Sequence, residues 1–340
     1  MSMLEIDNLQ ITYATREGPV HAVDGLSLSI GQDEIVGLAG ESGCGKTTLI
    51  RGLLRLLPKG AKVSADRFRW RDRDLLALDD RSFRREIVWN EISLVPQSAQ
   101  ASLNPVYRVG DQIVEAIREH SDSSRREAHE KVAELFDLVG LEPRLARAYP
   151  HEFSGGMRQR AMIAMSLALD PALVVMDEPT TGLDVLVQER IIRKIRELRE
   201  RSHNSILLIT HDISVIAEMS HRIAIMYAGR IMEVASAIDL FEQPVHPYTL
   251  GLKNAFPSIK ARGKPLISIP GSPPNLLGGV SGCPFAPRCP FAIERCEHER
   301  PALQPIATDH LAACHRAGEA ESMRERASEK ETWQFSKSAA

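Results

Sequence analysis

The stretch GESGCGKT, at residues 40–47, decides the fold of this 340-residue chain. It fits the pattern G-x-x-x-x-G-K-[ST] and lies between an apolar run at 34–39, typical of a buried strand, and a helical pattern at 47–57. Backbone N–H groups of such a loop bind phosphate oxygens, and glycines allow the tight wrap. The sequence therefore predicts a nucleotide-binding loop made by Gly40, Glu41, Ser42, Gly43, Cys44, Gly45, Lys46, Thr47 and Thr48.

Three side chains of the loop have distinct expected roles. Lys46 is predicted to reach the β- and γ-phosphates, and the Thr47 hydroxyl to bind Mg²⁺. Cys44 stands in a variable slot of the pattern and is interpreted as an incidental small residue. The alternative is a plain glycine-rich turn, which the flanking strand and helix patterns disfavour.

Acidic residues follow a second apolar run, LVVMDE at 173–178. A phosphate loop needs an acidic partner at the end of a neighbouring strand, so Asp177 is predicted to contact Mg²⁺ through water. Glu178, one residue further on, is predicted to act as general base on the attacking water. His211 ends a third apolar run and is a candidate contact for the γ-phosphate. The alternative for the acidic pair is a solvated turn after a strand.

The alternation of strand and helix patterns predicts an α/β fold with a parallel sheet. Runs at 92–95, 173–176 and 206–209 are typical of buried strands, while 3–13 and 20–31 alternate like an antiparallel pair. A capping box at Ser124 opens a further helical pattern.

Charge and hydropathy limit the function classes. The formal net charge of -3 gives no overall cationic field for nucleic acid. The long uncharged stretch at 265–287 holds too many Pro and Gly residues for a membrane helix, and the first residues lack a secretory pattern. We therefore expect a cytoplasmic chain that does not cross a bilayer.

The segment FSGGMRQR at 153–160 resembles the signature motif of ATP-binding cassette (ABC) ATPases. The phosphate loop, Gln97, MDEP at 176–179, TGLD at 181–184 and His211 complete the ordered motif set of that family. The resemblance covers about residues 1–245. It implies a P-loop core of the RecA-like kind, an antiparallel β subdomain and a helical subdomain at about 105–165.

The resemblance also implies further site residues. Ser154, Gly155 and Gly156 open a helix and form a second anion cradle, which in this family caps the γ-phosphate held by a partner cassette in a head-to-tail dimer. Gln97 is implied to join the catalytic and Mg²⁺ site, and Asp184 to communicate between the two ATP sites. Tyr13 matches the residue that stacks on adenine, and its alternative is a strand residue facing a core.

Other segments resemble a narrower branch, the ATPase subunits of oligopeptide, dipeptide and nickel importers. They are SLNP at 102–105, GDQI at 110–113, HPYT at 246–249 and the block at 282–296. The branch implies a peripheral subunit on the cytoplasmic face of the inner membrane, with two permease subunits, a second cassette and an extracytoplasmic substrate-binding protein. In such importers the region after Gln97 abuts the permease.

The resemblance favours peptide as cargo and leaves nickel or oligosaccharide open. The other alternative is a non-transport ABC ATPase acting on nucleic acid or ribosomes. The single cassette and the slightly acidic charge disfavour that alternative, so no nucleic acid partner is expected.

Four of the five cysteines, Cys283, Cys289, Cys296 and Cys314, cluster in a loop-rich segment. We expect residues 246–317 to form a small C-terminal domain that needs a cross-link, such as a bound metal, to be stable. Residues 318–340 are expected to be a disordered tail. Four thiolates suit zinc or an iron–sulfur cluster, and the importer resemblance favours a 4Fe-4S cluster with a structural role. The alternative is buried cysteines acting as small apolar residues.

Overall fold

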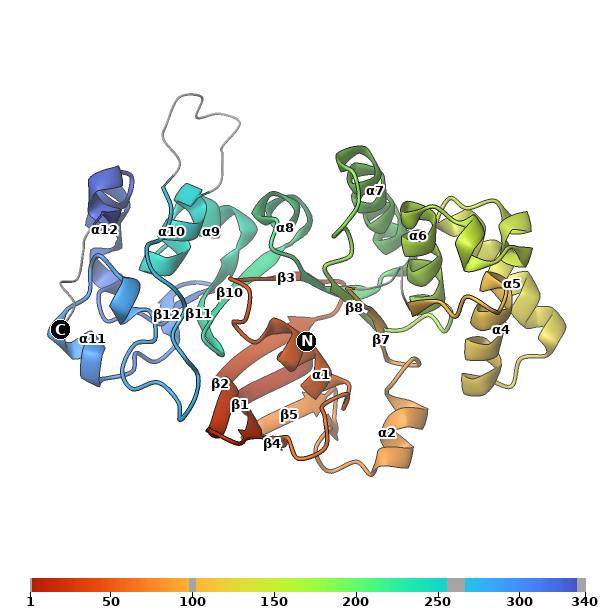
Figure 1. Ribbon diagram of the computed structural model, residues 1–340, viewed down its shortest axis with the longest axis horizontal. Coiled ribbons are helices and arrows are strands. Elements are labelled where there is room, and N and C mark those ends of the chain that lie inside the picture. Colours follow the sequence, from red (N-terminus) through yellow and green to blue (C-terminus); the bar gives the residue numbers. More distant parts are fainter. Residues whose placement is uncertain (1, 98–101, 256–266, 335–340) are drawn as a thin grey trace. The chain divides into compact units, whose positions relative to one another are not determined.

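A computed structural model describes residues 2–97, 102–255 and 267–334 (Figure 1). The chain divides into two compact units. The first comprises Met1–Leu4, Ile30–Val36 and Arg69–Thr210, and the second Glu5–Ser29, Gly37–Phe68 and His211–Ala340. The predicted domain boundaries at 245 and 317 stay predictions, although residues 211–340 belong to a single compact unit.

Three parallel strands form the centre of the first unit. In β7 (Ile92–Val95), β8 (Leu173–Asp177) and β9 (Ser205–Ile209), Val95 is paired with Met176, and Asp177 with Ile209. Their near-continuous apolar sequences are typical of strands covered on both faces. The strands predicted at 92–95, 173–176 and 206–209 are confirmed, and their parallel alignment brings the carboxyl ends of β7 and β8 to one edge.

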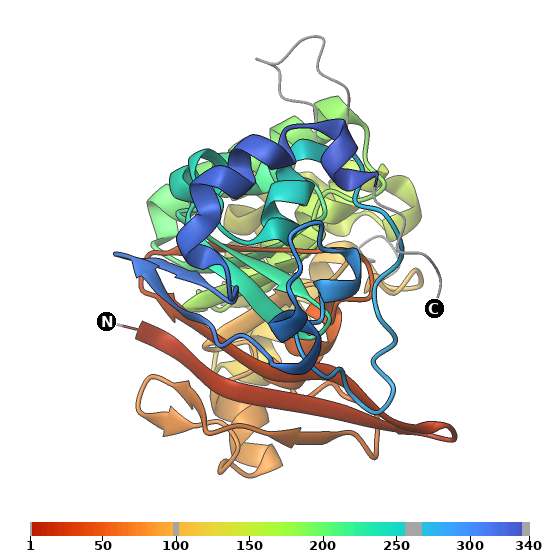
Figure 2. The same cartoon turned by 90° about the vertical axis from the view of Figure 1, so that its left-hand side faces the viewer.

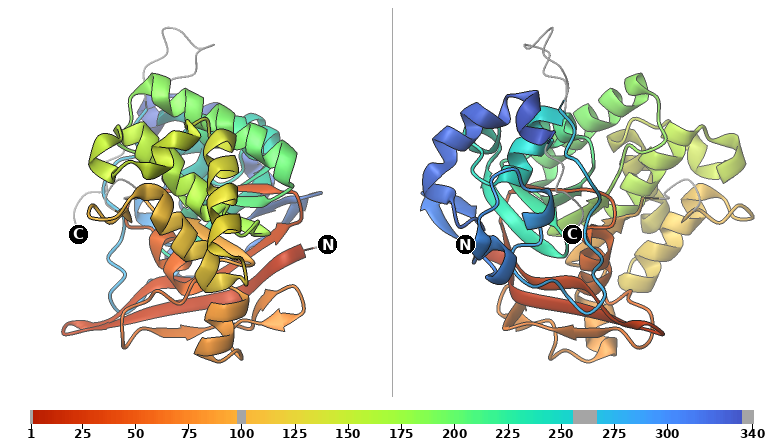
Figure 3. Two further views of the ribbon diagram at one scale, coloured as in Figure 1. Left: turned by 90° about the vertical axis from the view of Figure 1, so that its right-hand side faces the viewer. Right: turned by 60° about the vertical axis from the view of Figure 1, so that its left-hand side comes forward.

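Helices of the first unit gather in a cluster (Figure 3). Within it, α5 (Arg125–Leu138) packs against α4 (Val109–His120) and α6 (Gly155–Ser166). The predicted capping box is present at the start of α5, where Ser124 and Glu127 bond each other's backbone N–H groups. This unit also contains α7 (Val185–Ser202), η1 (Pro143–Arg147) and η2 (Pro150–Glu152).

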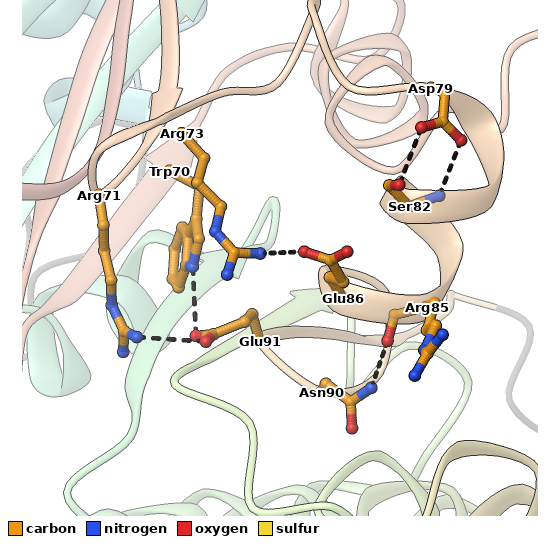
Figure 4. Close-up of polar contacts among 9 residues, drawn as sticks. All are labelled: Trp70, Arg71, Arg73, Asp79, Ser82, Arg85, Glu86, Asn90 and Glu91. Carbon is orange, nitrogen blue, oxygen red and sulfur yellow. Dashed lines mark hydrogen bonds and ion pairs between the residues drawn. The ribbon is translucent and has the colours of Figure 1, made fainter.

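Side-chain hydrogen bonds fix α2 and the residues around it in the first unit (Figure 4). Asp79 caps the helix by accepting from the Ser82 N–H at 3.0 Å. Glu91 accepts from the Trp70 indole N–H and from Arg71, both at 3.2 Å. These elements are α2 (Asp80–Glu86), β5 (Arg67–Trp70) and β6 (Arg73–Asp74).

The second unit contains the greater part, Glu5–Ser29, of the long antiparallel strands that the alternating patterns predicted. They are β1 (Ser2–Thr15) and β2 (Gly18–Gly31), and β4 (Lys62–Ser64) pairs with β1 through Gln10 and Ser64. The chain enters α1 (Lys46–Leu53) from β3 (Ile35–Ala39) through the glycine-rich loop.

An antiparallel group of strands completes the second unit, in the order β12-β13-β11-β10. The short helices α9 and α10 follow β11, and α12 lies beside α10 (Figure 2). The bounds are β10 (Arg222–Tyr227), β11 (Arg230–Ser236), β12 (Gln304–Ala307), β13 (His310–Ala312), α8 (Ile213–Met219), α9 (Ala237–Glu242), α10 (Pro247–Ala255), η3 (Ala286–Arg288), α11 (Glu294–His298), η4 (Ala317–Glu319), α12 (Ala320–Ala327) and η5 (Lys330–Trp333).

The described part of the segment expected to be a disordered tail is folded. Met323 and Ala327 are buried on one face of α12, and Trp333 is buried in η5. With Ala320, which is also buried, α12 has three apolar side chains at helical spacing, enough to dock a helix that is otherwise polar. Residues 335–340 lie outside the described ranges.

None of the helices in the described ranges combines the length and the apolar character that crossing a bilayer requires.

A buried carboxylate ties the C-terminal strands to α10. Glu233 of β11 is fully buried and accepts from the N–H groups of Val245 at 2.8 Å and His246 at 2.9 Å. Its Oε1 also lies 2.8 Å from Nε2 of the buried His310 in β13. A buried carboxylate that water does not reach needs such hydrogen-bond partners. Glu233 therefore holds together β11, the segment at 245–246 and β13.

The fully buried ring of His246 predicts a pH-dependent stability. Burial lowers its pKa from 6.5 to about 4, so the unfolded chain takes up the proton first as the pH falls. The contribution to the free energy of unfolding is complete above pH 6.5 and is lost towards pH 4, up to about 3 kcal/mol. In His246→Asn, the amide oxygen can accept from the Tyr248 N–H in place of Nδ1. Chemical denaturation of this variant should show a free energy of unfolding that falls less between pH 6.5 and pH 4 than that of the wild type. An unchanged pH profile would contradict this assignment.

Candidate active site

Two glycines allow the loop at 40–47 to take its path. A Cβ atom on Gly40 would lie 2.1 Å from the Met226 carbonyl oxygen, and one on Gly45 would lie 2.3 Å from that of Ala22. Gly45 also has a φ of 110°, which side chains rarely allow, and it caps α1. By contrast, nothing lies within 4 Å of a Cβ built on Gly43. The loop is thus fixed on one side and open at Gly43, as a phosphate cradle must be.

Lys46 is held inside this loop. Its side chain is 8% exposed, and Nζ donates to the carbonyl oxygens of Gly40 at 2.7 Å and Glu41 at 3.0 Å. The neighbouring Cys44 is also buried, and burial raises the pKa of its thiol despite the Lys46 charge. The thiol therefore stays neutral and leaves Lys46 as the cation of the loop.

Tyr13 of β1 lies close to the start of α1. Its hydroxyl donates to Oγ1 of Thr48 at 3.3 Å, and its side chain is only half-buried. This placement differs from that of a core-facing strand residue such as the fully buried Ile11. Stacking of Tyr13 on adenine stays a prediction.

In the first unit, the carboxylate of Glu178 is held by two donors. Its Oε2 accepts from Nε2 of Gln97 at 2.8 Å and from the Thr181 hydroxyl at 2.8 Å. The structure therefore brings together two residues predicted to be catalytic, from the ends of β7 and β8. Thr181 was missed as a partner, although it belongs to the TGLD motif.

The backbone at Glu178 is unusual. Its φ is 48°, a left-handed value that is uncommon for a side-chain-bearing residue, and its N–H donates to the Ile209 carbonyl at 2.7 Å. Such strain is concentrated at functional sites, where it aims a side chain. Asp177, the preceding residue, is 7% exposed at the end of β8.

The Ser-Gly-Gly segment opens α6 as predicted. Ser154 caps the helix by accepting from the Met157 N–H at 3.3 Å, and Gly155 and Gly156 form its first turn. A Cβ on Gly156 would lie 2.5 Å from Cγ1 of Val187, so this glycine permits a close approach of α7. The free N–H groups of a helix start suit an anion.

Asp184 and His211 lie just before the first turns of α7 and α8. The Asp184 Oδ1 accepts from the Val187 N–H at 2.9 Å at the start of α7, so Asp184 also serves as a helix cap. His211 is exposed and precedes Asp212, the N-cap of α8.

The prediction of an iron–sulfur cluster or zinc on Cys283, Cys289, Cys296 and Cys314 is wrong. Across the described ranges, no three or more His, Cys, Asp or Glu side chains form a group that could hold a metal ion. The four cysteines line one small cavity with apolar neighbours such as Phe291. Burial raises the pKa of Cys283 and Cys289, and that of Cys314 to about 12, as expected for cysteines that are buried as small apolar residues.

A strand–loop–helix phosphate cradle with a buried lysine, and an acidic pair at the end of a parallel strand, define a P-loop ATPase. Residues 23–181 match the family described as ABC transporter, and residues 232–296 match the family described as oligopeptide/dipeptide transporter, C-terminal region. The chain belongs to the ATP-binding proteins of oligopeptide and dipeptide ABC transporters, ATPases that couple hydrolysis to transport.

Relatives match along nearly the whole chain. A probable peptide ABC transporter ATP-binding protein of Sinorhizobium fredii is 45% identical over 93% of this chain and 96% of its own. The oligopeptide transport ATP-binding protein OppD of Salmonella typhimurium is 42% identical over 92% and 93%. The dipeptide transport ATP-binding protein DppD of Escherichia coli is 38% identical over 93% and 97%.

A solved structure agrees with the fold. The ATP-binding cassette MJ0796, in a dimeric post-hydrolysis state bound to ADP and Pi, is 26% identical with a TM-score of 0.60. The match covers 69% of this chain and 99% of that one. The predicted fold class, with its parallel and antiparallel sheets and helices, is confirmed.

Proposed function

We propose that this chain is the energy-coupling ATPase subunit of a peptide importer. The observation that carries the proposal is the extent of the likeness: peptide-transporter relatives match over 92–93% of the chain, and the match includes the C-terminal region at 232–296. A generic cassette would match only the nucleotide-binding part.

Glu178 is the proposed general base. Gln97 and Thr181 both hold Oε2, so the carboxylate keeps one orientation from which it takes a proton from the water that attacks the γ-phosphate. Asp177, Thr47 and Gln97 are the proposed ligands of Mg²⁺, and their oxygen atoms suit this hard cation. When bound, Mg²⁺ neutralises charge on the phosphates.

The remaining roles concern binding of ATP. Lys46 gives up its carbonyl partners for phosphate oxygens, Tyr13 stacks on adenine, and His211 contacts the γ-phosphate. Ser154, Gly155 and Gly156 bind the γ-phosphate held by a second cassette, a related chain or another copy, and Asp184 links the two sites. The open helix start capped by Ser154 supports this arrangement.

Exposed apolar side chains support contact with a permease. Val106 is 70% and Tyr107 59% exposed, just before α4. Gln112 fixes this turn, because its amide accepts from the Asn104 N–H at 2.8 Å and donates to the Tyr107 carbonyl at 3.1 Å. We propose that this turn binds one of two permease subunits at the cytoplasmic face of the membrane. Residues 98–101, also expected near the permease, lie outside the described ranges.

Tyr107→Ser should weaken retention of the permease by roughly 30-fold, the effect of removing a central interface aromatic residue, while ATP binding is unchanged. Co-purification in mild detergent measures this retention. Leu76→Ser, which changes another exposed apolar side chain of the first unit, serves as the control. Equal retention in both variants would exclude the turn from the interface.

Reconstitution tests the proposed cargo. The chain, its permease subunits, the second cassette and the substrate-binding protein are placed in proteoliposomes, and uptake of labelled di- and oligopeptides is followed with ATP inside. We expect ATP-dependent peptide uptake that stops with Glu178→Gln. ATPase stimulation by a binding protein loaded with nickel or oligosaccharide, and none with peptide, would contradict a peptide cargo.

A further inference from the structure

Glu41, the second residue of the phosphate loop, is bonded by residues that lie far away in the sequence. Its Oε2 is 2.8 Å from Nη1 of Arg288, 247 positions later. Its backbone N–H donates to the Tyr248 hydroxyl at 2.9 Å, across 207 positions. The C-terminal segment therefore holds both the side chain and the backbone of this loop residue.

The position of Arg288 is itself fixed. Its side chain is 7% exposed, Nε donates to the Pro270 carbonyl at 2.9 Å, and Nη1 lies 3.2 Å from the Tyr227 hydroxyl. A buried guanidinium needs a carboxylate and further acceptors to offset the loss of water. Glu41 is the carboxylate that forms this ion pair with Arg288.

An aromatic cluster forms the base of these contacts. The fully buried rings of Tyr227, Tyr248 and Phe285 lie with centroids 4.6 to 5.4 Å apart. The Arg288 guanidinium carbon lies 5.7 Å from the centroid of the Tyr227 ring. Burial, with the nearby Glu41 charge, raises the pKa of Tyr248, so its hydroxyl remains a neutral acceptor for the loop N–H.

The charge of Glu41 presents a problem for a loop that binds triphosphate. A carboxylate beside the phosphates repels them, and this repulsion is strong where water is scarce. The Arg288 guanidinium pairs with that carboxylate and neutralises it. Lys46 Nζ then remains the net cation of the loop.

We propose that Arg288 and Tyr248 are positioning residues of the ATP site. Arg288 neutralises Glu41, Tyr248 fixes the loop backbone, and the C-terminal segment thereby sets the affinity of the loop for ATP. This inference rests on the proposed role of the loop in ATP binding. Both residues act through Glu41, the loop residue to which Arg288 and Tyr248 are hydrogen-bonded.

The test is a titration of the full chain with labelled ATP, together with steady-state ATPase kinetics. Arg288→Ala should raise the Kd and KM for ATP roughly tenfold with kcat nearly unchanged, because the loop contacts are present in ground and transition states alike. Arg288→Lys should recover part of the affinity. Tyr248→Phe should raise the Kd a few-fold, by about the effect of one lost neutral hydrogen bond.

A second substitution makes the test specific. Glu41→Gln removes the charge that Arg288 neutralises, so the double variant Arg288→Ala with Glu41→Gln should bind ATP within about threefold of wild type. Arg300→Ala is the matched control. Arg300 belongs to the same C-terminal segment as Arg288 and forms an ion pair with Asp24 of β2, so its loss should leave the Kd for ATP unchanged.

Failure of this inference is distinct from failure of the proposed function. If the wild-type chain does not bind ATP, the proposed function fails. If it does, but folded Arg288→Ala binds ATP as tightly as wild type, or Glu41→Gln fails to restore the double variant, the inference is overturned. Should Arg288→Ala not fold, Arg288→Gln takes its place, because it removes the charge and keeps part of the side chain, and a wild-type Kd for ATP in that variant overturns the inference equally.

Discussion

Glu178→Gln is expected to keep ATP bound while turnover falls by roughly 10²- to 10⁴-fold, the usual contribution of a general base. The amide has nearly the shape of the carboxylate and can still accept from Gln97 and Thr181, so the contacts of the site survive. Only the ability to take a proton from water is lost. Binding and catalysis should therefore separate in this variant.

Phosphate release measures turnover, and titration with labelled ATP measures binding. Glu130→Gln changes an exposed glutamate of α5, paired with Arg126 on the surface, and should behave as wild type. Hydrolysis by Glu178→Gln within tenfold of wild type would assign the general base elsewhere.

Lys46→Ala should instead abolish tight binding, with a Kd for ATP raised roughly 100-fold, the upper range for a hydrogen bond between charged groups. The same lysine now donates to the Gly40 and Glu41 carbonyls, so its loss also removes bonds that shape the empty loop. Both effects act before any chemistry takes place.

The control for this variant is Lys62→Ala, which removes an exposed lysine of β4 in the same unit. Thermal unfolding of each variant shows whether the fold is kept. A Lys46→Ala chain that is folded and binds ATP with the wild-type Kd would remove the lysine from the site.

The sequence alone predicted those features that depend on residues close together in the chain, such as buried strands and the glycine-rich loop. The apolar runs at 173–176 and 206–209 are strands because such side chains must be buried on both faces of a parallel sheet. Glycines 40 and 45 predicted the phosphate loop, and carbonyl oxygens within 2.3 Å of their absent Cβ atoms explain why. Gln97 was indicated only by the family resemblance, and its hydrogen bond to Glu178 became visible with the parallel pairing of β7 and β8.

Features that depend on distant contacts could not be predicted in this way. Nothing in the variable second position of the loop indicated that Glu41 would pair with Arg288. The tail at 318–334 looked polar, yet Met323 and Trp333 have partners that only the fold provides. The four cysteines are close in sequence and line one cavity, but closeness alone does not create a metal-binding geometry.

The contact between Glu233, His246 and His310 has a consequence for protein engineering. The C-terminal segments of related cassettes could be exchanged at the predicted boundary near residue 245. A chimaera joined there would separate His310 from its buried carboxylate and Arg288 from Glu41, two donor–acceptor pairs that must be inherited together. The two residues of each pair should therefore come from the same parent protein, so that a chimaera keeps the contacts that hold the second unit together.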